Sequence, residues 1–206
     1  YGDEAMFLCE EGATPMQLDQ AVYHWGMAMG PMAMNDLAGL DVSWLIRQGK
    51  AKPTGRYSVI PDRICELGHF GQKTGSGFFR YEAGSRVPVS DPEVDAMIVA
   101  EAEAAGIAQR DISDTEIVER LIYSLINAGA KILEDGIAQR ASDIDVIYVY
   151  GYGFPVFRGG PMFYADTVGL KTVYDRICQF DAEASDDRWS PAPLLKRLAE
   201  EGGTFN

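Results

Sequence analysis

One pattern of residues occurs twice in this chain with the same internal spacing. Gly-Pro-Met, an aspartate and Gly-Leu occupy residues 30–40, and the same six residue types recur at residues 160–170. A similar stretch precedes each copy, at Ala5–Gly12 and at Ala130–Gly136, and the second copy carries small insertions. The spacing predicts an internal duplication of one supersecondary unit, so we expect the chain to fold as two related halves.

The opening helix is complete in only one of the two copies. Ser113–Glu116 is a helix-start signal, and the apolar residues after it recur at spacings of three and four: Ile117, Leu121, Leu125, Ala128 and Ile132. This pattern predicts a helix of about six turns that ends at Gly136. In the first copy only eleven residues precede Gly12, and no start signal is present. We therefore expect the chain to be part of a longer polypeptide.

Most of the remaining sequence also predicts helices. Thr14–Gln17 is a capping box with proline at the first helical position, and one face of the helix that follows is apolar: Leu18, Ala21, Val22 and Trp25. Glycines at 26 and 30 end this helix. Pro31 opens the next one, whose predicted buried stripe is Met34, Leu37, Leu40, Trp44 and Leu45.

The other segments alternate between turns and short helices. Loops are expected at 49–55, where Gly, Pro, Lys and Thr cluster, and at Asp181–Pro193. Short helices are expected at Ile64–Leu67 and Leu194–Glu201, and a further helix at Glu93–Ala105. An extended piece is expected at Phe78–Tyr81 and a linker at Pro88–Pro92. The predicted fold class is all-α, with two tandem, internally duplicated helical domains packed as a pseudo-dimer. The first domain, with its linker, spans 1–110 and the second spans 111–206.

Composition excludes several classes of partner. The net charge of −13 argues against nucleic acid or an anionic membrane, because either would require a basic surface. No segment approaches the roughly 18 to 20 apolar residues of a membrane span. The three cysteines, Cys9, Cys65 and Cys178, are widely spaced and predict neither a disulfide framework nor a zinc site. We expect a reducing, cytoplasmic compartment.

Two glycine-rich stretches superficially resemble nucleotide-binding loops. Gly151–Val156 follows a β-prone stretch, but Val156 stands where a dinucleotide fingerprint needs its third glycine, so a turn between helices is the better interpretation. Gly71–Gly77 contains Lys73 and Thr74, but Gln72 occupies the place of the glycine that precedes the lysine in a phosphate-binding loop. A structural turn is favoured there, and Lys73 stays a weak candidate for contact with a ligand phosphate.

The duplicated aspartates and a group of methionines leave two interpretations open. Asp36 and Asp166 follow the proline of each copy by five residues. This position favours a structural role, in which each carboxylate bonds backbone amides or caps a helix. Gly160 and Pro161 are given the same structural role at the second turn. Four methionines surround the first turn, at positions 27, 29, 32 and 34. Flexible side chains of this kind suit either core filling or an acyl-chain pocket. In the second case the substrate wall is formed by Met29, Gly30, Pro31 and Met32.

These motifs resemble a known family. Glu11–Pro15 and Met29–Asp41 are similar to the C-terminal helical domain of L-3-hydroxyacyl-CoA dehydrogenases, and Phe70–Phe78 resembles the segment that closes it. Tyr150–Pro155 and Arg158–Met162 resemble the second copy found in multifunctional fatty-acid oxidation enzymes. This chain departs from the family pattern at two positions: Ala28 replaces a proline, and Met32 replaces an aromatic residue.

The resemblance implies a dehydrogenase that transfers the C3 hydride of a 3-hydroxyacyl-CoA to NAD, in an enzyme that also carries a hydratase half. In that family the NAD-binding Rossmann domain and the catalytic histidine and glutamate lie upstream, so no catalytic, cofactor or metal residue is assigned here. The asparagine-arginine pair that the family uses in its first helical domain falls before Tyr1. Its counterpart in the second copy is Glu119-Arg120, which lacks the asparagine. We therefore expect an inactive part of an enzyme. The alternative is a stand-alone helical interaction or dimerisation module without a substrate.

Overall fold

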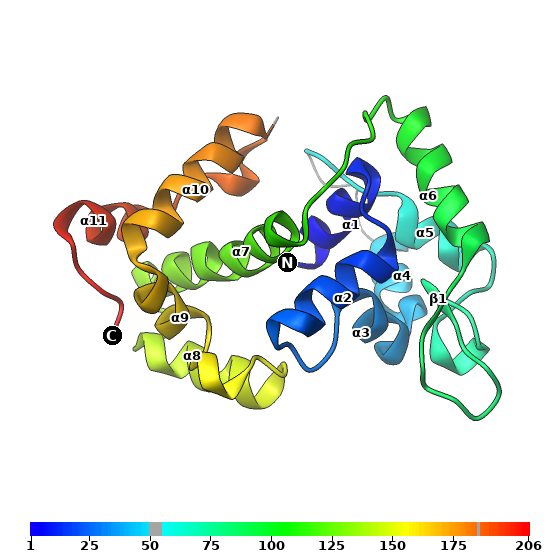
Figure 1. Ribbon diagram of the computed structural model, residues 1–206, viewed down its shortest axis with the longest axis horizontal. Coiled ribbons are helices and arrows are strands. Elements are labelled where there is room, and N and C mark those ends of the chain that lie inside the picture. The colour runs from blue at the N-terminus through cyan, green and yellow to red at the C-terminus, as the bar shows by residue number, and fades with distance from the viewer. Residues whose placement is uncertain (50–54, 185) are drawn as a thin grey trace. The chain divides into compact units, whose positions relative to one another are not determined.

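The computed structural model describes residues 1–49, 55–184 and 186–206. Within these ranges the fold is all-α, as predicted, and its sheet is one antiparallel pair of two-residue strands, β1 (Phe79–Arg80) and β2 (Val89–Ser90). The α-helices are α1 (Gly2–Glu11), α2 (Pro15–Trp25), α3 (Pro31–Ala38), α4 (Leu40–Gln48), α5 (Ile60–Glu66), α6 (Pro92–Ala104), α7 (Asp114–Glu134), α8 (Ala141–Gly151), α9 (Pro161–Val168), α10 (Leu170–Glu183) and α11 (Pro193–Glu201) (Figure 1). The described residues also form three short 3₁₀ helices: η1 (Gln72–Thr74), η2 (Val156–Arg158) and η3 (Asp187–Trp189).

The described residues form two compact units. The first unit comprises Gly2–Trp25 and Met29–Val118, and the second comprises Tyr1, Gly26–Ala28 and Glu119–Asn206. Helix α7 passes from the first unit into the second.

The duplication predicted from the sequence is present in the structure. Helices α2, α3 and α4 of the first copy have the same order as α8, α9 and α10 of the second. Helices α3 and α9 both begin at the proline of the repeat, and α4 and α10 both begin at its leucine. In both copies an eight-residue helix headed by proline ends at a glycine of matching backbone conformation, with φ 94° and ψ 115° at Gly39 and φ 95° and ψ 120° at Gly169. Only glycine adopts such a positive φ readily, which explains why each copy keeps the Gly-Leu pair.

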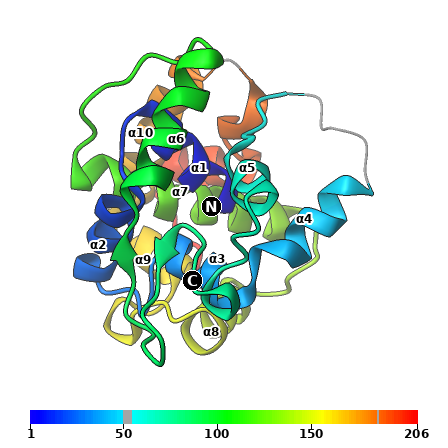
Figure 2. The same cartoon turned by 90° about the vertical axis from the view of Figure 1, so that its right-hand side faces the viewer.

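The core of the first unit is built around α1, α2 and α6. Leu8, Leu18 and Val22 have no exposed surface. Phe79, the first residue of β1, and Phe78, which precedes it, are also fully buried. Figure 2 shows α6 near α1 and α5, the two helices on which it packs. The hairpin of β1 and β2 therefore lies on an otherwise helical core.

The second unit packs α10 against α11 and α8 against α9 (Figure 1). Val173 and Ile177 of α10 are fully buried, and the Phe180 and Trp189 rings pack at a tilt of 46° with centroids 4.8 Å apart. Asn127 of α7 is 3% exposed; its side chain donates to the carbonyl of Ser190 at 3.0 Å and accepts from the amide of Ala192 at 2.8 Å. This side chain fixes the chain segment that leads into α11.

Both predicted helix starts are confirmed. The Thr14 hydroxyl accepts from the amide of Gln17 at 3.1 Å, and the Ser113 hydroxyl accepts from the amide of Glu116 at 3.2 Å. Each bond satisfies an amide that has no partner inside the first turn of its helix. Gly136, with φ 68°, follows the end of α7 as expected.

The predicted stripe after Pro31 is wrong in part. Leu40 is buried, but Leu37 is 50% exposed and Leu45 is 66% exposed. The reason is the break at Gly39, which separates α3 from α4, so the two segments do not share one helical phase. In α7 the late positions of the predicted series also reach the surface, at Ala128 and Ile132.

Smaller corrections concern the connecting segments. The expected linker at Pro88–Pro92 contains strand β2, and the polar loop predicted from Asp181 is shortened because α10 continues to Glu183 and η3 follows. The β-prone Val146–Tyr150 stretch is helical within α8. The loop predicted at 49–55 falls largely on residues 50–54, outside the described residues. No helix in the described parts of the chain is long and apolar enough to cross a membrane.

Candidate functional site

The first Gly-Pro-Met turn is held by a buried aspartate of the preceding helix. The Asp19 carboxylate, on α2, accepts the amides of Met32 at 2.9 Å and Ala33 at 2.8 Å. These amides belong to the first turn of α3, where backbone N–H groups lack helical partners and favour a negative charge. A Cβ at Gly30 would lie well under 3.0 Å from the Asp19 carboxyl carbon. Glycine is therefore required for the carboxylate to reach the helix start.

The second copy repeats this arrangement. Asp145 of α8 accepts the amides of Met162 at 2.7 Å and Phe163 at 3.1 Å, at the start of α9. A Cβ at Gly160 would lie well under 3.0 Å from the Cβ of Asp145. We call each pair of an α2 or α8 aspartate with the two amides of the next helix an amide staple. The staple is a shared structural element of the two copies.

The aspartates found by the sequence pattern hold a later segment. Asp36 of α3 accepts the amides of Phe78 at 2.9 Å and Phe79 at 3.0 Å and the hydroxyl of Tyr81 at 2.9 Å. Gly77 leaves room for this carboxylate and Gly71 leaves room for the Asp36 backbone, since a Cβ at either would lie well under 3.0 Å from these Asp36 atoms.

In the second copy, Asp166 of α9 accepts the amides of Phe205 at 2.8 Å and Asn206 at 3.1 Å, and also the Asn206 side-chain amide at 3.1 Å. Asp36 and Asp166 thus connect α3 and α9 to chain about forty residues downstream rather than to their own turns.

Burial raises the pKa of the aspartates in the first unit. The pKa of Asp19 rises to about 7 and that of Asp36 to about 6, although the amide hydrogen bonds act in the opposite direction. Burial also raises the pKa of Asp145, again against two amide hydrogen bonds. In all three aspartates the effect of desolvation on the pKa exceeds that of the amide hydrogen bonds.

The candidate substrate wall of the first copy is only partly accessible. Met29 is half-buried, Gly30 and Pro31 are buried, and Met32 has no exposed surface. The first unit contains Met29–Met32, whereas Met27 groups with the second unit. Within this set, Met29 is the side chain that a ligand in solution reaches.

Sequence reasoning did not single out Asp19 or Asp145. The available signal was the repeated apolar-aspartate pair, Leu18-Asp19 and Ile144-Asp145, which precedes the Gly-Pro-Met turn in both copies. The pairing spans 13 residues in the first copy and 17 in the second, so no helical spacing reveals it.

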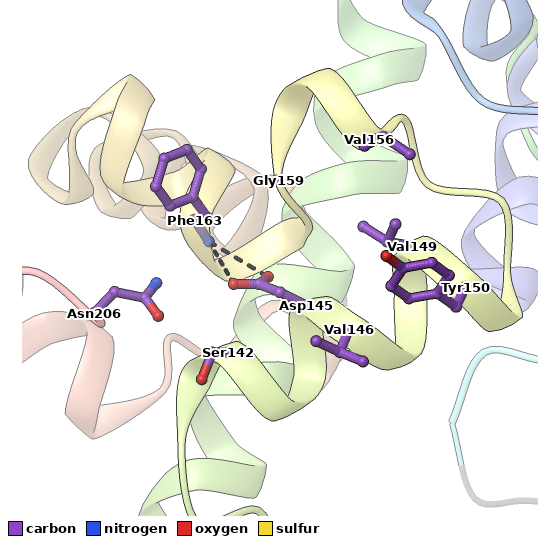
Figure 3. Close-up of a pocket in the computed structure, with 9 residues that line it drawn as sticks. All are labelled: Ser142, Asp145, Val146, Val149, Tyr150, Val156, Gly159, Phe163 and Asn206. Carbon is purple, nitrogen blue, oxygen red and sulfur yellow. Dashed lines mark hydrogen bonds between the residues drawn. The ribbon is translucent and has the colours of Figure 1, made fainter.

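The second unit carries an open, largely apolar pocket beside its amide staple. Its volume is about 340 Å³, and it is lined by Ser142, Asp145, Val146, Val149, Tyr150, Val156, Gly159, Phe163 and Asn206. Figure 3 shows Val146, Val149 and Tyr150 along α8, with Val156 across from Val149 and Tyr150 and the Asp145 carboxylate directed at the amide of Phe163. Because the Asp145 carboxylate is engaged by two amides, the pocket offers an apolar surface rather than an acid-base pair.

The chemistry of the described residues fits neither a metal nor a dinucleotide. They contain no cluster of three or more His, Cys, Asp or Glu side chains that could hold a metal ion. A dinucleotide site needs a glycine turn between a parallel strand and a helix, but Gly151 ends helix α8 and leads into a turn. Lys73, the weak phosphate candidate, forms an ion pair with Asp41. Neither glycine-rich stretch therefore forms a dinucleotide-binding turn.

Comparison with known proteins identifies the family. The model for "3-hydroxyacyl-CoA dehydrogenase, C-terminal domain" matches residues 1–81 and again residues 117–204, once in each copy. The peroxisomal bifunctional enzyme of Danio rerio is 44% identical over 98% of this chain. The fatty acid oxidation complex subunit alpha of a Shewanella species is 31% identical over the whole chain. The chain spans 30% and 29% of the length of these two relatives.

Solved structures share the fold. The dehydrogenase part of multifunctional enzyme 1 from C. elegans aligns with 95% of this chain and 44% of its own, with a TM-score of 0.73 and 27% identity. The 3-hydroxybutyryl-CoA dehydrogenase of Escherichia coli aligns with 98% of this chain and 58% of its own, at a TM-score of 0.72, but its 17% identity supports the fold alone. The duplicated helical fold and the two family matches together show that this chain belongs to the 3-hydroxyacyl-CoA dehydrogenase C-terminal domain family.

Proposed function

We propose that this chain is the C-terminal, substrate-side part of an NAD-dependent 3-hydroxyacyl-CoA dehydrogenase of fatty-acid β-oxidation. The observation that carries the proposal is that one dehydrogenase C-terminal family model matches both copies. The reaction is the oxidation of a 3-hydroxyacyl-CoA to the 3-oxoacyl-CoA. The Danio rerio relative is named a bifunctional enzyme, which supports an enoyl-CoA hydratase activity in the same polypeptide.

The proposed division of labour follows from what the described residues contain. NAD supplies the hydride acceptor when it is bound, and we assign its site to an upstream Rossmann domain of the same polypeptide, because the residues described here do not fit it. The hydroxyl proton is likewise accepted by a base outside this chain. The isolated chain is therefore expected to be inactive.

The role of this chain in the reaction is to enclose the acyl-CoA substrate. We assign Met29, Gly30, Pro31 and Met32 to the substrate wall, with the half-buried Met29 as the contacting side chain. Asp19 supports this wall because its staple fixes the start of α3. Asp36, Gly160, Pro161 and Asp166 are assigned a structural role: Gly160 and Pro161 at their turn, and Asp36 and Asp166 as acceptors that hold a segment about forty residues downstream. An apolar wall of this kind orients an acyl chain and excludes water from the reacting carbon.

Two further assignments accompany this function. The domain division at 1–110 and 111–206 follows the two copies of the repeat. The compartment is open to test, since the Danio rerio and Arabidopsis thaliana relatives carry peroxisomal names, whereas cysteine usage predicts a cytoplasm-like compartment. A fluorescent fusion of the full-length protein distinguishes peroxisomes from cytoplasm.

The experiment that tests the function is a spectrophotometric assay of NADH formation. The full-length polypeptide, supplied with NAD and a 3-hydroxyacyl-CoA, is expected to form NADH. The 206-residue chain alone is expected to form none and to show no heat of NAD binding in calorimetry. A full-length protein without this activity would contradict the proposed function, and turnover by the isolated chain would contradict the assignment of catalysis to another domain.

A further inference from the structure

Helix α4 carries an apolar surface on the side that faces away from the first unit. Val42 is 56% exposed, Leu45 66% and Ile46 53%, and Leu37 at the end of α3 is 50% exposed. Val42, Leu45 and Ile46 follow the three- and four-residue spacing that places side chains on one face of a helix. We call these three residues the α4 stripe.

The opposite side of α4 already holds the helix to the first unit. Leu40 is buried, and the Trp44 ring stacks on Phe70 with centroids 6.1 Å apart. Arg47 forms a salt bridge with Asp62 of α5 at 2.7 Å, and Figure 2 shows α4 and α5 side by side. Helix α4 is therefore apolar on two sides, and a helix of this kind is normally buried on both.

The second copy provides an internal comparison for the stripe. By the spacing of the repeat, Thr172, Asp175 and Arg176 of α10 correspond to Val42, Leu45 and Ile46. Thr172 and Asp175 are exposed and Asp175 pairs with Lys171, whereas the half-buried Arg176 pairs with Glu119 of α7 at 2.7 Å. The equivalent positions of the helix are thus polar in copy two and apolar in copy one. The contrast is explained if a further protein surface packs on the stripe of α4 and none packs on the equivalent positions of α10.

We propose that the α4 stripe is the surface on which the upstream part of the same polypeptide packs. This inference rests on the proposed function. The chain spans 30% of its Danio rerio relative, and the matched family model is by name a C-terminal domain, so most of such a polypeptide lies outside this structure. Copy one is the first copy in the chain, and segments that follow one another closely usually pack as neighbours.

The charges around the stripe define the chemistry of the partner surface. Asp41 is paired with Lys73, and Arg47 is paired with Asp62, so the charged groups of α4 are neutralised within the first unit. The surface that covers the stripe is therefore apolar and uncharged, as in the packed centre of an interface between domains. Together with Leu37, the stripe presents on the order of 300 Å² of apolar surface, which supplies the centre of a typical interdomain contact.

Photo-crosslinking in the full-length protein tests this assignment. The photoreactive residue p-benzoylphenylalanine replaces Ile46 in one variant and Thr172, the exposed α10 counterpart of the neighbouring Val42, in the other. After illumination, mass spectrometry identifies the peptides joined to each position. We expect Ile46 to crosslink within one polypeptide to a peptide upstream of this chain, with a yield several-fold above that at Thr172.

The other outcomes overturn the proposal. They are crosslinks from position 46 to residues 119–206, crosslinks between two copies of the protein, or a yield no higher than at Thr172. NADH formation by the unmodified full-length protein is measured separately. An active enzyme without the upstream crosslink refutes the inference alone, whereas an inactive enzyme with the crosslink refutes the proposed function alone.

A second test uses proteolysis of variants of the full-length protein. A Leu45→Glu and Ile46→Glu double variant is expected to be cleaved faster than a Thr172→Glu variant. Equal cleavage rates would contradict the proposal.

Discussion

Replacing Gly30 with alanine should break the amide staple of the first copy. The new Cβ would lie well under 3.0 Å from the Cγ, Oδ1 and Cα atoms of Asp19. Both groups are buried, and the contact includes backbone, so rotation of a side chain does not relieve it. The chain must then separate α2 from the start of α3 or release the Asp19 carboxylate from its two amides.

The magnitude follows from the two lost hydrogen bonds. Each bond joins a backbone amide to a carboxylate, and such bonds contribute about 1.5–3 kcal/mol. Partial hydration of the released groups reduces the sum, so we expect the free energy of unfolding to fall by about 3–5 kcal/mol. For a chain of this size each kcal/mol shifts Tm by about 2–4 °C. The Gly30→Ala variant should therefore melt about 6–20 °C below the parent chain.

Thermal unfolding followed by circular dichroism measures this shift. The matched control is Gly151→Ala, because Gly151 lies at the end of a helix and a Cβ there meets nothing within 4 Å. Alanine is a better helix former than glycine, so the control should be unchanged or more stable by up to about 1 kcal/mol. In an Asp19→Ala background, Gly30→Ala should cost less, because the contacts with the Asp19 Cγ and Oδ1 are gone and only the contact with the Cα remains. A Gly30→Ala protein that melts with the parent, or full additivity with Asp19→Ala, would refute the reasoning.

The other predictions concern the buried polar groups. Because burial raises the pKa of Asp19 to about 7, the folded chain binds a proton between about pH 4 and 7 that the unfolded chain does not bind. Urea unfolding at a series of pH values should therefore show that the parent gains free energy of unfolding relative to Asp19→Asn as pH falls through this range, by up to about 1.4 kcal/mol per pH unit. A difference between the two proteins that does not change with pH would contradict the raised pKa. Asp36→Ala removes the acceptor of three hydrogen bonds at a residue that is 1% exposed, so it should lower the free energy of unfolding by about 3–5 kcal/mol. Asp166→Ala, at a half-buried site, should lower it less. Urea unfolding compares the two variants, and equal losses would count against the role of burial. Asn127→Ala should lower the free energy of unfolding by about 2–4 kcal/mol, because the Ala192 amide and the Ser190 carbonyl lose their hydrogen bonds. A Tm unchanged from the parent would show that the segment before α11 does not depend on the Asn127 side chain.

Local sequence signals predicted the repeat and the helices well. The Thr14 and Ser113 caps act within four residues of chain, so their hydrogen bonds are readable from spacing alone. The two Gly-Pro-Met turns were equally readable, because proline and glycine restrict the backbone in ways that any fold must respect.

Tertiary features were harder to predict. The buried stripe after Pro31 failed because Gly39 takes up a positive φ and divides one expected helix into two of different phase. The amide staples were missed because each joins the side chain of one helix to the backbone of the next, a pairing with no sequence period. Strand β2 was missed because Val89 and Ser90 are extended only through pairing with β1.

Steady-state kinetics of the full-length enzyme test the central claim, that the first turn contacts the acyl-CoA substrate. The variant is Met29→Asp, with Met29→Leu as the conservative replacement and Ile137→Asp, at a side chain 74% exposed in the second copy, as the matched control. Burying an unpaired carboxylate against an acyl chain costs several kcal/mol, on the order of a hundredfold or more in kcat/KM. We predict that Met29→Asp raises KM or lowers kcat while Met29→Leu and Ile137→Asp retain activity, with Tm measured on all three. Equal activity in the Met29→Asp and Ile137→Asp enzymes would contradict the assignment of the substrate wall to this turn.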